Sequence, residues 1–100
     1  MFLHIVLLEK EKLLLHVSVH NKDTMHNIIQ ECELIYNYAL LYKPLRIVET
    51  IVICQNDEIN FFVKKYMKYY GIDNVRGGSY INNELTDMER SNIVREQLLN

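Results

Sequence analysis

The sequence contains no tryptophan and only one proline, three glycines and two cysteines in 100 residues. Cys32 and Cys54 do not form a CxxC pair, which is the spacing typical of a zinc or redox site. We therefore expect two buried thiols rather than a disulfide. No internal repeat, low-complexity segment or linker divides the chain. Since 100 residues suffice for one hydrophobic core but not for two, we predict a single domain over residues 1–100.

Long apolar runs are also missing, and neither sign of charge dominates. The longest apolar runs, MFLHIVLL and LLLHVSV, are interrupted by His4 and His16 and are too short to span a bilayer. No charged segment precedes a cleavable apolar stretch, so we expect no signal peptide and an intracellular protein. A net charge of −2 argues against a whole surface devoted to nucleic acid and leaves room only for a local basic face.

Two apolar runs at the start of the chain predict a pair of strands. Residues 2–8 and 13–19 are rich in Leu, Ile and Val, as half-buried or buried strands are. Four alternating charges, from Glu9 to Lys12, connect the two runs as a short solvated hairpin. The connection contains neither Gly nor Asn, so the sequence leaves its turn type undefined.

A helix and a third strand follow the hairpin. Apolar residues at spacings of three and four predict a helix over residues 24–40, with Asp23 or Thr24 as its cap. Pro44 lacks a backbone donor and restricts the residue before it, so the helix must end earlier. Residues 46–54 are mostly β-branched and apolar, and we predict a third strand that lies centrally in the sheet.

The next predicted helix leads into a turn with a distinctive sequence. Residues 57–70 carry an apolar stripe at helical spacing, with Asn56 or Asp57 at the N-cap position. Gly71 directly follows the last periodic residue and favours the left-handed conformation that ends many helices. The chain then reads IDNVRGG, in which Gly and Asn tolerate backbone angles that other residues resist. We expect a structural motif that is held by tight backbone turns and side-chain bonds to carbonyl groups: Gly71, Asn74, Arg76, Gly77 and Gly78.

The last predicted element is a short helix over residues 86–98. Thr86 and Glu89 have the spacing of a capping box, in which each side chain bonds the backbone N–H of the other residue. Together the elements predict an α+β fold with a small three-stranded, mainly antiparallel sheet packed by about three helices. Their order along the chain is β-β-α-β-α-α.

Two segments of the chain resemble a known family. YKPLRIVE, from Tyr42 to Glu49, and YMKYYGIDNVRGGSY, from Tyr66 to Tyr80, are similar to the GIY-YIG nuclease-like proteins of large DNA viruses. The likeness is close over residues 42–80 and weaker on either side. It implies a GIY-YIG-like fold, whose order of elements agrees with the order that periodicity predicts.

The same resemblance implies what an active enzyme would need. An active family member is expected to carry tyrosines on both hairpin strands, an arginine on the first helix, and a glutamate on a later helix that holds a divalent metal. These groups would supply the proton transfer, charge stabilisation and metal anchoring that phosphodiester hydrolysis requires.

In this sequence the expected catalytic positions hold other residues. The hairpin positions fall near His4 and within Lys12–His16, and no arginine precedes Arg46. The metal position falls just after Glu58, and a slip of one residue rotates a helical side chain by about 100°. We therefore expect a pseudo-nuclease with no catalytic residues, no metal site and no cofactor. A divalent metal would be required only if nuclease activity persisted.

The four histidines raise the question of a metal site. His16 and His20 are four residues apart on one predicted strand, which separates them by ~13 Å, too far to share one zinc ion. His4 and His16 face each other across the predicted hairpin, where the alternative to a plain strand-face pair is a replacement general base. We favour the strand-face pair.

Two hypotheses for function follow. The first is a non-enzymatic viral protein that binds another protein or itself, as a virion or assembly component, in the host cytoplasm, the viral factory or the virion. The second is a nucleic-acid-binding domain or a residual metal-dependent endonuclease. Neither a membrane span nor a small-molecule substrate is indicated. The candidate nucleic-acid contacts are Lys43, Arg46, Lys64, Lys65, Lys68 and Arg76.

Overall fold

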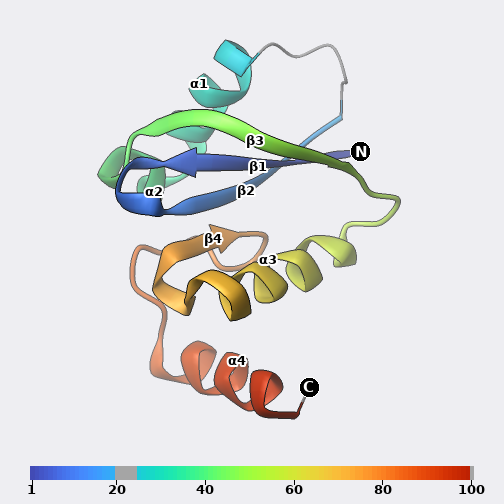
Figure 1. The fold of residues 1–100 in the computed structure, drawn as a ribbon, viewed down its shortest axis with the longest axis vertical. Helices are drawn as coiled ribbons and strands as arrows, with labels where there is room; N and C mark the ends of the chain where they lie inside the picture. The colour runs from blue at the N-terminus through green and yellow to red at the C-terminus, as the bar shows by residue number, and fades with distance from the viewer. Residues whose placement is uncertain (20–24, 100) are drawn as a thin grey trace.

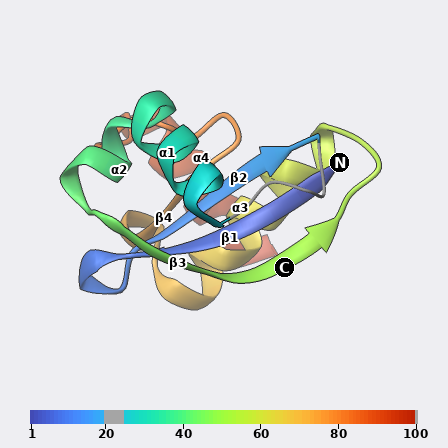
Figure 2. The ribbon, with the colours of Figure 1, turned by 90° about the horizontal axis from the view of Figure 1, so that it is seen from above.

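The computed structural model describes residues 1–19 and 25–99, and it is an α+β fold built on one four-stranded mixed sheet. Its strands are β1 (Phe2–Leu8), β2 (Leu13–Ser18), β3 (Pro44–Val52) and β4 (Val75–Gly77), and its helices are α1 (Met25–Ile35), α2 (Asn37–Leu41), α3 (Asp57–Tyr70) and α4 (Asp87–Leu99). The strands lie in the order β3-β1-β2-β4 (Figure 1). Helices α1 and α2 cover one face of the sheet, and α3 lies on the other face with α4 beyond it (Figures 1 and 2).

The third strand lies at an edge of the sheet, which corrects the prediction of a central strand. Within the described residues β3 pairs with β1 alone, and it spans residues 44–52 rather than 46–54. Most of its side chains are exposed. The β-branched composition of this strand therefore reflects a preference for extended backbone and not burial on both faces.

A fourth strand corrects the prediction of a three-stranded antiparallel sheet. β4 pairs in parallel with β2, and Leu13 lies opposite Val75 in this pairing. The strand is only three residues long and belongs to the segment interpreted as a turn. A run this short carries no periodicity, so its pairing depends on the long-range position of the hairpin.

The helix predicted over residues 24–40 is broken in two at Tyr36. This residue has extended backbone angles (φ −112°, ψ 120°), so α1 ends just before it and α2 starts just after it. Its hydroxyl oxygen lies 3.1 Å from Nδ1 of His16, and this contact ties the break to the sheet. The predicted caps Asp23 and Thr24 lie outside the described residues.

Helix α3 has the predicted bounds but uses different end interactions. The side chain of the N-cap residue Asn56 makes no capping bond. The Glu58 carboxylate instead accepts the backbone N–H groups of Cys54 and Gln55, at 2.7 and 3.0 Å. These bonds lower the pKa of Glu58. Gly71 ends the helix with φ +100° and ψ 143°, which is a glycine conformation other than the left-handed helical one.

Helix α4 begins with the predicted capping box. The Thr86 N–H donates to Oε1 of Glu89 at 3.0 Å, and the Glu89 N–H donates to Oγ1 of Thr86 at 3.1 Å. The reciprocal pair satisfies two donors that the first helical turn would otherwise leave without partners.

The side chains of β1 and β2 alternate between the two faces of the sheet and build two hydrophobic layers. The layer facing α3 and α4 contains Leu3, Ile5, Leu13, Leu15, Val63, Met67, Val75 and Ile93. The layer facing α1 and α2 contains Val6, Leu8, Leu14, Ile28, Cys32, Tyr38 and Ala39.

Both cysteines are free thiols, but they differ in burial. Cys32 is a buried residue of α1, as expected, whereas Cys54 is exposed just after β3. The expectation of two buried thiols is wrong for Cys54 because β3 ends before this residue. In residues 1–19 and 25–99, no helix has the length and apolar character that crossing a membrane would require.

Candidate functional site

The two hairpin histidines lie opposite each other on the face of the sheet that α1 covers. His4 of β1 is the cross-strand partner of His16 of β2, as the hairpin predicts. His4 is buried, with Nδ1 at 2.9 Å from Oγ1 of Thr50 and Nε2 at 2.8 Å from Oγ of Ser18. Both of its ring nitrogens are thus engaged by side chains of the sheet.

His16 is bonded to residues of α1 and of the break between α1 and α2. It is also buried, with Nε2 at 2.8 Å from Oε2 of Glu31 and Nδ1 at 3.1 Å from the hydroxyl of Tyr36. Because both hairpin imidazoles are buried and hydrogen-bonded, they do not form an accessible general base. His20 lies outside the described residues. Among residues 1–19 and 25–99, no three His, Cys, Asp or Glu side chains are placed to hold one metal ion.

The basic residues predicted to contact nucleic acid do not form one surface. Lys64, Lys65 and Lys68 lie together on α3 and line a groove between α3 and α4. Arg46 lies on β3 and lines a separate cleft beside the hairpin turn. Lys43 is exposed just before β3. Of these residues, the three lysines of α3 share one groove, and Lys43 and Arg46 lie on other elements.

Arg76, the sixth residue of that set, is buried and removed from it. Its side chain is 1% exposed, and its guanidinium carbon lies 5.1 Å from the centroid of the Tyr38 ring. The guanidinium donates hydrogen bonds of 2.6 to 3.0 Å to backbone carbonyls, which leaves it turned away from solvent. The accepting carbonyls belong to Ile72, Val75, Asn82 and Asn83.

The glycine-rich turn depends on close backbone approaches. Gly77 has φ +149°, and a Cβ atom there would lie 2.6 Å from the carbonyl oxygen of Leu15 in β2. Gly78 has φ +57°, and a Cβ atom there would overlap Oδ1 of Asn60, which accepts the Ser79 N–H at 2.9 Å. Only glycine fits both the positive φ and the available space at these two positions.

Asn74 links the end of α3 to the hairpin. Its Nδ2 donates to the carbonyl oxygen of Tyr70 at 2.6 Å, and its Oδ1 accepts a hydrogen bond from Nζ of Lys12 at 2.6 Å. The residues singled out in this segment therefore position structural elements against one another, and Asn74 also lines the cleft beside the hairpin turn.

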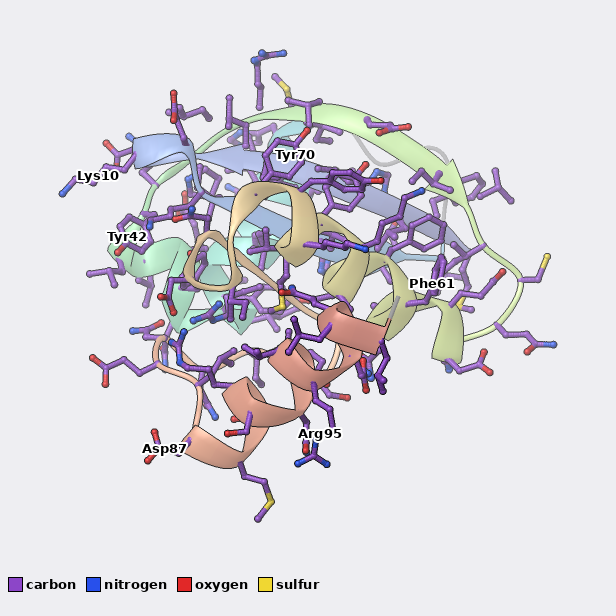
Figure 3. All side chains as sticks on the ribbon, turned by 60° about the horizontal axis from the view of Figure 1, so that its bottom comes forward. Lys10, Tyr42, Phe61, Tyr70, Asp87 and Arg95 are labelled. Carbon is purple, nitrogen blue, oxygen red and sulfur yellow. The ribbon has the colours of Figure 1, made fainter. Side chains whose placement is uncertain are left out.

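The lysine groove is the open depression between α3 and α4, and it has a volume of about 360 Å³. Phe61 (labelled in Figure 3) and Tyr69 are 64% and 72% exposed and line the groove together with the lysines. Nζ of Lys64 lies 3.0 Å from a carboxylate oxygen of Glu96 on α4, and this hydrogen bond raises the pKa of Lys64. The groove thus combines positive charge with two accessible aromatic rings.

One buried donor in the lysine groove has no acceptor among the residues that the structure describes. Nε2 of Gln97 on α4 is inaccessible to solvent, and no described residue accepts a hydrogen bond from it. A buried donor without a partner costs about 1–3 kcal/mol. A rotation of this side chain toward the three lysines of the groove would bring the donor within reach of a ligand oxygen.

A second depression lies on a different face of α3. We call it the bulge cleft, because the pairing of β3 with β1 shifts register beside it. It has a volume of about 740 Å³ and is bounded by the hairpin turn, by β3 and by the last turns of α3. The Tyr66 hydroxyl donates to Oε2 of Glu49 across this cleft at 2.9 Å. Burial, and then this bond, raise the pKa of Tyr66 to about 12. Arg46 and Tyr70 also line the cleft.

No protein-family model matches the chain, and no curated protein or solved structure is significantly similar to it. Sequence reasoning missed Gln97 and the partnership of Tyr66 with Glu49. In the sequence, Gln97 looks like an ordinary surface residue of a helix. Glu49 reaches the cleft through a shift of register in β3, and no local sequence pattern predicts that shift.

Proposed function

We propose that the chain is a catalytically inactive GIY-YIG-like domain that serves as a protein-interaction module. In this proposal the lysine groove binds an acidic segment of a partner protein. The observation that carries the proposal is the unsatisfied Nε2 donor of Gln97 within a groove lined by three lysines. A glutamate or aspartate carboxylate accepts hydrogen bonds both from an amide N–H and from lysine ammonium groups.

The positions where the resemblance places catalytic groups support an inactive domain. His4 and His16 are buried in hydrogen bonds between the sheet and α1. Glu58 uses one carboxylate oxygen to accept two backbone N–H groups at the start of α3. These residues contribute to the stability of the fold, which is a role that a packing module retains when catalysis is lost.

The distribution of charge favours a peptide over a long nucleic acid. Glu96 lies in the groove and pairs with Lys64, so the positive charge is confined to a short stretch. Phe61 and Tyr69 offer apolar contact area beside it, and aromatic residues are enriched in protein interfaces. The resemblance supports the biological setting, which is the assembly of a large DNA virus in the infected cell or in the virion.

A binding experiment with matched variants tests the proposal. The probe is a short fluorescent peptide rich in glutamate and leucine, and its affinity is measured by fluorescence anisotropy. The double variant Lys65→Gln/Lys68→Gln leaves the Lys64–Glu96 pair in place and should weaken binding at least about tenfold, or about 1.4 kcal/mol. The control Lys10→Gln/Lys43→Gln changes the net charge equally outside the groove and should bind as the unmodified protein does.

If the two double variants weaken binding equally, the peptide responds only to the net charge of the protein, and the proposal is overturned. Binding of an acidic peptide of the same charge that lacks leucine should be weaker, because Phe61 and Tyr69 would lose their apolar contacts. If the leucine-free peptide binds equally well, the aromatic residues have no part in the interface.

Nucleic-acid binding is a second candidate, and one observation favours it. Two exposed aromatic rings beside three lysines are also the elements of a surface that stacks single-stranded bases and neutralises phosphates. An oligonucleotide that binds the groove more tightly than the acidic peptide, with affinity falling steeply as salt rises, would replace the peptide proposal.

A further inference from the structure

An irregularity in β3 places two opposite charges side by side in the bulge cleft. Leu7 of β1 lies opposite Arg46, and Ile5 lies opposite Glu49, with a shift of register between the two pairs. Without that shift, residues three apart on a strand would point to opposite faces. The bulge therefore turns Arg46 and Glu49 to the same face, which is the face of Ile5 and Leu7. Bulges often re-aim side chains in this way beside functional sites.

The hairpin turn at the rim of the cleft adds backbone strain. Lys10 and Glu11 have φ of 58° and 60°, the positive values that both central residues of a type I′ turn require. Glycine and asparagine normally occupy such positions, and another residue there costs about 1–2 kcal/mol. The sequence instead keeps a cation and an anion at this rim (Figure 3, Lys10).

The charges of the cleft do not neutralise one another by contact. Across residues 1–19 and 25–99, Lys10, Glu11 and Arg46 make no ion pair, and Glu49 has no cation within ion-pair distance. Glu49 is oriented instead by the neutral hydroxyl of Tyr66. A cleft with two unpaired cations and two carboxylates suits a ligand that carries both signs of charge.

The remaining walls of the cleft are aromatic and apolar. The ring of Tyr70 stacks on that of Tyr66 with an interplanar angle of 14°, and Tyr70 is 54% exposed, so it offers a planar surface to a ligand. Ile5 and Leu13 form part of the apolar lining. A volume of about 740 Å³ lies within the range of sites for small molecules.

We propose that the bulge cleft binds a free α-amino acid with an aromatic side chain. Arg46 binds the ligand carboxylate, with its planar guanidinium matching the two oxygens, and Glu49 binds the α-ammonium group. The ligand ring packs on Tyr70 and the apolar lining. Lys10 and Glu11 at the rim balance the field, so that neither a purely anionic nor a purely cationic ligand is favoured.

Three ligands that differ by one charge test this assignment on the full chain. The probes are L-phenylalanine, N-acetyl-L-phenylalanine, which lacks the ammonium, and L-phenylalaninamide, which lacks the carboxylate. Binding is measured by calorimetry and by amide shifts in nuclear magnetic resonance spectra. Phenylalanine should bind with a dissociation constant on the order of 1 mM and shift the amides of β3, while both derivatives bind at least about tenfold more weakly.

Variants then separate the two charged contacts. Arg46→Gln should weaken phenylalanine binding about tenfold without changing the weak binding of phenylalaninamide. Glu49→Gln should also weaken phenylalanine binding about tenfold, without changing the weak binding of N-acetylphenylalanine. Tyr66→Phe removes the hydroxyl that donates to Glu49 but keeps the carboxylate, so it should retain most of the binding. If Tyr66→Phe is as weak as Glu49→Gln, the carboxylate does not bind the ligand, and the assignment fails.

Neighbouring tyrosines give a matched control for the ring contact. Tyr70→Leu should weaken phenylalanine binding several-fold, whereas Tyr69→Leu, which alters the lysine groove, should leave it unchanged. Equal binding of the three probes, or no shift of β3 amides at about 20 mM phenylalanine, would overturn the proposal. Tighter binding of adenosine monophosphate than of phenylalanine would assign the cleft to nucleotides and would also overturn it.

Discussion

Arg76 packs its guanidinium against the ring of Tyr38, with 5.1 Å between the guanidinium carbon and the ring centroid. The Tyr38 hydroxyl continues past this contact and donates to the carbonyl oxygen of Asp73 at 2.7 Å. A residue of α2 and a residue of β4 thus hold the same loop from two sides. The segment GIDNVRGG, which carries most of the resemblance to the viral proteins, therefore contacts α2 through Arg76 and Asp73.

The first prediction concerns this buried arginine. Arg76→Leu removes the donors that satisfy four backbone carbonyls and should lower the free energy of unfolding by about 3–5 kcal/mol. Urea denaturation followed by circular dichroism measures the change. Arg95→Leu removes an exposed arginine from α4 and should change stability by less than about 0.5 kcal/mol. Comparable losses for the two variants would contradict the role of Arg76.

A second prediction compares two glycines that both have positive φ. Gly77→Ala should destabilise the fold more than Gly71→Ala, because its Cβ would meet the backbone oxygen of Leu15 at 2.6 Å. At Gly71 the new Cβ would meet the side chain of Asn74 at 2.9 Å, and a side chain can move aside. Strain of this kind costs about 1–3 kcal/mol. Thermal unfolding of the two variants checks the order, and a reversed order would show that the approach to β2 is not tight.

The sequence predicts those features of the fold that depend on residues close together in the chain. The start of α4 follows from Thr86 and Glu89 alone, because a capping box involves residues three apart. The bounds of α3 follow from an apolar stripe within one helix. The break at Tyr36 was not predictable, because apolar spacing continues across it and the deciding contact is with His16 on a distant strand.

The candidate site was less predictable than the fold. The lysines of α3 lie close in sequence, so their shared surface could be expected. Arg76 looks the same in the sequence as an exposed arginine, and only the packing of α2 and β4 buries it. The bulge that brings Arg46 and Glu49 to one face depends on the pairing of β3 with β1, which no local pattern encodes.

A third prediction concerns alkaline pH. Burial is the main cause that raises the pKa values of Tyr36, Tyr38 and Tyr66 to about 12, against about 10 in an unfolded chain. The folded state therefore holds these phenolic protons more tightly, so their contribution to stability is complete below about pH 10 and is lost as the pH rises toward 12.

Tyrosinate absorbance and circular dichroism, recorded together from pH 8 to pH 12.5, measure this effect at about half-unit steps. A late phase of ionisation should coincide with loss of folded structure, and each Tyr→Phe variant at these positions should reduce its amplitude. Complete ionisation near pH 10 in a protein that stays folded would contradict the raised pKa values of the three tyrosines.

A fourth prediction separates the stability of the lysine groove from its binding role. Gln97→Met keeps the shape of the side chain but removes the buried donor that lacks an acceptor, so it should raise the free energy of unfolding by about 1 kcal/mol. The same variant should bind the acidic peptide more weakly, because the donor is then missing when the ligand arrives. A variant that is destabilised and binds normally would show that the amide has a structural partner instead.

The most direct measurement of the central claim is a nuclear magnetic resonance titration of the labelled chain with the glutamate- and leucine-rich peptide. We expect the side-chain amide signal of Gln97 and the backbone amides of residues 61–69 to shift together and saturate. A single-stranded oligonucleotide of equal charge, at the same salt concentration, should shift them less. Shifts confined to other surfaces, or a groove that responds to the oligonucleotide alone, would contradict the proposal that this domain binds an acidic protein segment.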